Sequence, residues 1–126
     1  MKKKPQIVFW TALLWSVTIF ILLIIPGQEF SGAPRVPFLD KIIHIFLFGI
    51  QVLLWCRYID LSRTTPVLRN FLLVFFISCL FGIAMEFVQK YGVANRSFET
   101  EDIVADIIGS AMGWLIYRYF FLSRRK

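Results

Sequence analysis

The chain alternates between long stretches without charge and short segments that hold charged and turn-forming residues. The longest uncharged stretch runs for 24 residues between Lys4 and Glu29. About 20 apolar residues cross the hydrocarbon core of a bilayer as a helix, so this stretch can span alone. Three shorter apolar stretches reach that length when the polar residues at one end are included. The pattern predicts an all-α protein, an integral membrane four-helix bundle in one domain over residues 1–126, with helices at about 7–25, 40–59, 69–89 and 101–121.

Composition supports a lipid environment. Hydrophobic residues make up 58% of the chain and charged residues 17%, against about 45–50% and about 25% in soluble domains. A water-soluble domain of 126 residues could not bury so much apolar surface. In a soluble domain the net charge of +6 would suggest nucleic acid. Here we interpret the charge as a topology signal, and we expect a lipid bilayer and no nucleic acid as the partner.

The distribution of Lys and Arg predicts the orientation of the helices. Four spans place both termini on one side, together with the segment that joins the second and third helices. That side holds 10 Lys and Arg residues, and the opposite side holds 4. Cytoplasmic segments carry the excess of Lys and Arg in membrane proteins. We therefore expect both termini in the cytoplasm and a multi-pass protein of the cytoplasmic membrane.

Polar residues gather at the ends of the helices that lie away from the termini. Helices two, three and four each bring a polar pair with helical spacing to the same membrane level, and these residues are Asp40, His44, Glu86, Gln89, Asp102 and Asp106. Lys90 and Arg96 lie close by in the chain. A carboxylate below the membrane surface, as expected for Asp106, is costly and indicates function by default. We expect the polar pairs to converge.

Small residues on the fourth helix predict a close helix contact. Gly109 and Gly113 form a GxxxG pattern on the same face as Asp102 and Asp106. Such patterns let two helix backbones approach closely. The contact is expected either within the chain or across a homo-oligomer.

Three motifs resemble those of the VanZ-like family. The segment 40–48 resembles its D-K-x-x-H-x-x-x-F motif, and segment 86–89 resembles its E-x-x-Q. Segment 96–109 resembles R-S-F…D-x-x-A-N-x-x-G, with Asp106 where the family usually has Asn. The resemblance implies a small bacterial integral membrane protein with a role in the cell envelope, and the family name comes from resistance to the glycopeptide antibiotic teicoplanin. It does not supply a reaction.

The first functional hypothesis is a site for a phospholipid or a lipid-linked envelope precursor. Its catalytic candidates are Asp40, His44 and Glu86, because an imidazole oriented by a carboxylate transfers protons near neutral pH. Its binding candidates are Gln89, Arg96, Asp102 and Asp106. Arg96 and Lys90 could hold an anionic head group, and the two aspartates could hold a divalent cation. The sequence leaves open whether the protein is an enzyme.

Two other hypotheses remain. Carboxylates and a histidine inside a membrane can form a proton relay, so the chain could handle protons or ions. Alternatively, the polar residues could be structural, because buried ion pairs can specify how helices pack without adding stability.

Cysteine labelling tests the predicted topology. In a background with Cys56 and Cys79 replaced by serine, Gly32→Cys should react with a membrane-impermeant maleimide in intact cells. Ser62→Cys should react only after permeabilisation. The opposite labelling pattern would overturn the orientation.

Overall fold

The structure is a computed structural model that describes residues 3–25, 39–64, 68–93 and 100–122. Every regular element within these ranges is helical, so the predicted all-α fold is confirmed. The elements are α1 (Lys3–Ile24), α2 (Leu39–Ser62), α3 (Leu68–Gly92), α4 (Thr100–Tyr117) and a π-helical turn, η2 (Arg118–Leu122). The four helices lie within a few residues of the expected ranges.

Three of the helices, α1, α2 and α3, are long and apolar enough to cross a membrane. α4 has only 18 residues, and three acidic side chains lie in its first two turns. Large hydrophobic side chains face outward along the bundle, among them Trp10, Phe46, Phe76, Ile77 and Leu80. A soluble protein of this size does not expose such a surface. The protein is therefore a membrane protein whose outward-facing side chains contact lipid.

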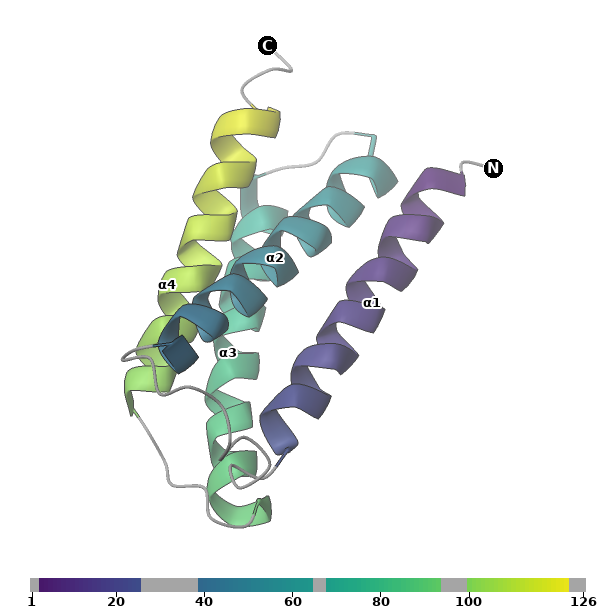
Figure 1. Cartoon of the computed structure of the whole chain (residues 1–126). Coiled ribbons are helices and arrows are strands. Elements are labelled where there is room, and N and C mark those ends of the chain that lie inside the picture. Colours follow the sequence, from purple (N-terminus) through teal and green to yellow (C-terminus); the bar gives the residue numbers. More distant parts are fainter. Residues whose placement is uncertain (1–2, 26–38, 65–67, 94–99, 123–126) are drawn as a thin grey trace.

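The helices run up and down, so each end of the bundle collects residues from distant parts of the sequence. α1 begins at the same end at which α2 ends, α3 begins and η2 ends (Figure 1). We call this the terminal end. α2 begins, α3 ends and α4 begins at the opposite, distal end (Figure 1).

α2 and α4 form the tightest contact of the bundle. A Cβ atom on Gly109 would collide with the backbone of Ile45, and one on Gly113 would collide with the backbone of Gly49. The predicted close contact of the GxxxG face is therefore confirmed. It is formed within the chain, so α2 covers the face that a second copy would need.

Two apolar clusters complete the core. One joins α1, α2 and α3 through Ile19, Leu23, Leu47, Phe48 and Met85. The other lies nearer the terminal end and joins α2, α3 and α4 through Val52, Cys56, Phe71, Val74 and Tyr117.

Helix α1 is also attached by hydrogen bonds. The indole of Trp15 donates to the Leu47 carbonyl at 2.9 Å. The Ser16 hydroxyl donates to Oε1 of Gln51 at 2.8 Å. These bonds fix the register of α1 on α2 within the apolar part of the bundle.

A glycine-to-alanine comparison tests the α2–α4 contact. Gly113→Ala should lower the unfolding free energy in detergent by about 1–3 kcal/mol, because the added methyl group overpacks the interface. Gly92→Ala is the matched control, since the nearest atom to its Cβ would be a Val88 methyl at 4.0 Å. Equal melting temperatures for the two variants would contradict the assignment.

Candidate functional site

The distal end contains a buried histidine–carboxylate pair between α2 and α4. Nδ1 of His44 lies 2.7 Å from Oδ1 of Asp106. The Asp106 side chain is only 1% exposed, and His44 is also buried. The backbone of Ile45 on α2 touches Gly109 on α4. His44 directly precedes Ile45, and Asp106 lies one turn before Gly109, so the two side chains meet. The close backbone contact therefore brings the two side chains together.

A second polar pair lies beside the first. Nζ of Lys41 is 2.5 Å from Oδ1 of Asp102 and 2.8 Å from Oδ2 of Asp40. Asp102 is buried, whereas the Asp40 side chain is 63% exposed. Nε2 of His44 lies 4.0 Å from Oδ2 of Asp102. The imidazole is thus placed between two carboxylates of α4, and the ammonium of Lys41 offsets the charge of one of them.

Helix α3 packs against the His44–Asp106 pair, which lies between α2 and α4. A Cβ atom on Gly82 would lie 2.8 Å from Oδ2 of Asp106, so glycine leaves the space that this carboxylate occupies. Oδ2 accepts no hydrogen bond from the described part of the chain. A buried oxygen without a donor is destabilising. Enclosing this oxygen therefore costs folding free energy.

Other polar residues of α3 extend the site in two directions. Glu86, one turn from Gly82, is buried and near enough to act electrostatically on His44. On the opposite side of Gly82, the hydroxyls of Ser78 and Ser110 lie 3.0 Å apart and are buried. A polar stripe therefore runs from the distal end towards the middle of the bundle.

The arrangement has the chemistry of an acid–base pair. A carboxylate at Nδ1 fixes the orientation and tautomer of an imidazole and leaves Nε2 to exchange a proton. Nε2 of His44 faces Asp102, which also carries the contact with Lys41. The four side chains thus combine a proton-transfer group with two carboxylates and one cation.

The divalent cation that the sequence allowed at the aspartates gains no support from the geometry. No group of three or more His, Cys, Asp or Glu side chains within the described ranges is arranged to hold a metal ion. The ammonium of Lys41 lies against Asp102.

The structure brings some of the sequence candidates together and separates others. His44, Asp102 and Asp106 converge, with Glu86 nearby. Asp40 contacts only the outer side of the group through Lys41. Gln89 instead donates to the Leu23 carbonyl of α1 at 2.9 Å, which is a helix-packing role. Arg96 lies outside the described residues.

Sequence reasoning overlooked Lys41 as a site residue. Its ammonium contacts Asp102 at 2.5 Å. Its spacing of three residues from His44, which places both on one helix face, was the signal available in the sequence.

A second buried carboxylate, at the terminal end, was also overlooked. Asp60 accepts a hydrogen bond from the hydroxyl of Tyr117, and Nη1 of Arg57 lies 3.6 Å from it. The i, i+3 spacing of Arg57 and Asp60 was visible in the sequence, but the contact with Tyr117 depends on the packing of α4 against α2.

An uncharacterised protein of the fission yeast Schizosaccharomyces pombe, C11E3.10, is 34% identical over 103 residues, which cover 79% of this chain. The chain spans 60% of the length of that relative. No solved structure matches the chain.

The family assignment rests on a match over nearly the whole chain. The sequence model of the family described as VanZ/LLP1 matches residues 4–122. Apart from Lys3, the first residue of α1, this range contains all four helices, and it contains the complete distal group of polar side chains. The chain therefore belongs to the VanZ/LLP1 family.

Proposed function

We propose that this protein binds the polar head group of a membrane lipid at its distal end and acts on it by acid–base chemistry. The observation that carries the proposal is the buried contact of 2.7 Å between His44 and Asp106. His44 would transfer the proton through Nε2, and Asp106 would hold the ring. Asp102 and Lys41 would surround the reacting group.

The free energy that is needed to bury these charged side chains favours a functional role. α2 and α4 are already held together by backbone contact at Gly109 and Gly113. Burying an ion pair costs desolvation and often adds no stability over apolar packing. Asp106 adds a further cost, because its Oδ2 accepts no hydrogen bond from the described residues. Polar groups that do not improve packing are better explained by chemistry.

The position of the site favours a lipid as ligand. The group lies at one end of helices that can span a membrane, where lipid head groups are found. With the termini in the cytoplasm, as the charge distribution predicts, the site would face away from the cytoplasm. In a bacterial cytoplasmic membrane, that orientation would give access to phospholipids and lipid-linked envelope precursors. Arg96, next to α4 in the chain, remains the predicted contact for an anionic head group.

A structural role is the second candidate, favoured by the fact that both pairs connect α2 to α4. In this role, His44–Asp106 and Lys41–Asp102 would set the register of the two helices. Removal of either partner would then destabilise the bundle without any effect on chemistry.

Turnover of defined lipids tests the proposed function. Purified protein in nanodiscs should be mixed with phosphatidylglycerol, phosphatidylethanolamine, cardiolipin and undecaprenyl phosphate, and head-group changes followed by mass spectrometry. His44→Gln and Asp106→Asn should each lower turnover of the responsive lipid by about 10²–10⁴-fold, the usual contribution of acid–base catalysis. The lipid-facing variant Phe76→Ala should retain it.

Two results would count against the acid–base proposal. The first is turnover that persists in His44→Gln at the rate of the parent protein. The second is no turnover of any of the four lipid classes by a protein that is folded and inserted.

A double-mutant cycle tests the structural alternative. If the His44–Asp106 contact serves packing, His44→Ala and Asp106→Ala should show a stabilising coupling of about 0.5–3 kcal/mol in detergent unfolding. A coupling near the upper limit together with unchanged turnover would favour the structural role.

A further inference from the structure

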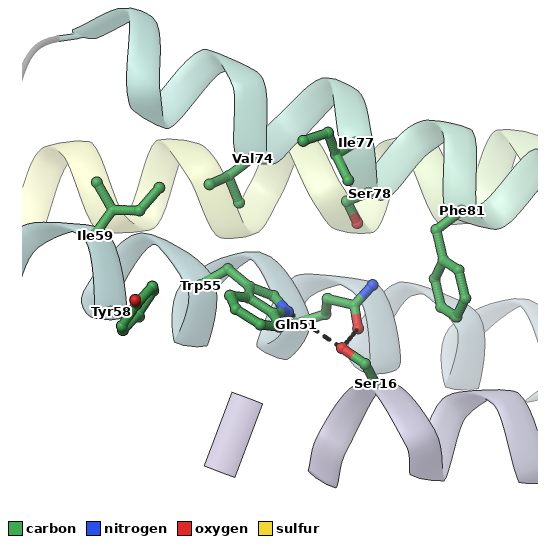
Figure 2. A pocket seen from close by; sticks show the side chains of 9 residues that line it. All are labelled: Ser16, Gln51, Trp55, Tyr58, Ile59, Val74, Ile77, Ser78 and Phe81. Atoms are coloured by element: carbon green, nitrogen blue, oxygen red, sulfur yellow. Dashed lines mark hydrogen bonds between the residues drawn. The ribbon is translucent and has the colours of Figure 1, made fainter. Parts of the chain in front are cut away.

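A cavity of about 390 Å³ lies between α1, α2 and α3 on the terminal side of the polar site. Its volume is within the usual range for ligand pockets, about 300–1,000 Å³. Figure 2 shows side chains of α3 facing those of α2, with Ser16 of α1 on the remaining side. Ile77, which is 63% exposed, forms part of its rim. The lining residues are Ser16, Gln51, Trp55, Tyr58, Ile59, Val74, Ile77, Ser78 and Phe81.

Several polar groups of this lining, those of Ser16, Trp55 and Ser78, are already bound to protein partners. The hydroxyl of Ser16 donates to Gln51 and accepts from the Trp55 indole at 3.1 Å (Figure 2). The hydroxyl of Ser78 is paired with that of Ser110. A buried water needs two to four polar partners, and this lining offers few. The cavity therefore suits an apolar occupant.

A second hollow, of about 280 Å³, lies between α1 and α2 nearer the terminal end. Its lining residues are Pro5, Gln6, Phe9, Trp10, Tyr58 and Ser62. Tyr58 lines both spaces, and its ring lies 5.3 Å from that of Phe9. Clusters of Trp and Tyr are typical of the level at which a membrane meets water. We therefore expect the hollow at the membrane surface, and the cavity lies deeper in the bundle.

Cations flank the second hollow. Lys4 precedes Pro5 in the chain, and Arg63 follows Ser62; both are exposed. Arg57 and Arg69 lie at the same end of the bundle. This arrangement complements the phosphate of a lipid head group.

We propose that the cavity and the hollow together bind one anionic phospholipid. One acyl chain occupies the cavity, and the phosphate lies at the hollow beside Lys4 and Arg63. Along α2 the cavity extends from Gln51 to Ile59, about 12 Å at the helical rise. That length is close to the depth of one leaflet, about half of a 30 Å hydrocarbon core. The proposed phosphate position lies at the opposite end of the bundle from His44, and the site does not depend on the proposed chemistry there.

Photocrosslinking tests the acyl chain position. The full-length protein in phosphatidylcholine nanodiscs should receive a few mole per cent of phosphatidylglycerol that carries a diazirine in one acyl chain. We expect adducts concentrated on Trp55, Tyr58 and Ile77. Unlabelled phosphatidylglycerol should compete at least fivefold better than unlabelled phosphatidylcholine.

Matched variants separate the site from ordinary lipid contact. Ile77→Trp should reduce the adducts severalfold because the larger ring fills the rim of the cavity. Leu80→Trp is the control on the same helix, since Leu80 is 64% exposed but does not line the cavity. Lys4→Gln combined with Arg63→Gln should remove the preference for phosphatidylglycerol, whereas Arg118→Gln at the same end should retain it. The Lys4 and Arg63 side chains are exposed, so their replacement leaves the fold intact.

Adducts spread over Leu73, Phe76 and Leu80 as strongly as over the cavity would overturn the proposal, since they would indicate only the surrounding lipid. Equal competition by phosphatidylcholine would do the same. Because the readout is binding, a failure of the lipid-turnover experiment leaves this result interpretable by itself.

Discussion

Direct backbone contact between α2 and α4 is the constraint on which the rest of the structure depends. Gly109 and Gly113 leave no space for a Cβ atom against Ile45 and Gly49. Helices in such contact bring side chains one turn away within hydrogen-bond distance. His44 and Asp106 are placed in this way, and so are Lys41 and Asp102 one turn nearer the distal end. The position of the polar site is a consequence of where the glycines lie.

The packing of α2, α3 and α4 also determines how much free energy it costs to bury Asp106. Asp106 is enclosed by α2 on one side and by Gly82 of α3 on the other. His44 supplies a partner to one of its oxygens only. The VanZ-like motif usually has Asn at the position of Asp106. An amide there would need no counter-charge. The charge of the carboxylate, in contrast, must be offset by His44 and by the nearby Lys41–Asp102 pair. The acidic residue therefore ties the electrostatics of this site to its histidine and lysine neighbours.

The bundle divides into two regions with different chemistry. α2, α3 and α4 enclose the polar group at the distal end. α1 packs on α2 and α3 through an apolar cluster and a few hydrogen bonds, and it borders the cavity on the terminal side. The ionisable side chains of the distal site and the apolar cavity thus lie at different heights of the bundle, with Ser78 between them. That separation matches the layers of a bilayer, in which head groups lie outside the hydrocarbon.

The sequence by itself determined the helices and the level of the polar residues, because charge-free length and i, i+4 spacing are local properties of the chain. It also predicted the glycine contact, and it left Asp40, Glu86 and Asp106 open as partners of His44. Only the tertiary structure decided the pairing: Lys41 contacts Asp102, Gln89 turns to α1, and Asp60 meets Tyr117. The cavity beside Trp55 was equally beyond the sequence. Pairing and voids depend on the rotation and distance of neighbouring helices, and a linear pattern does not specify either.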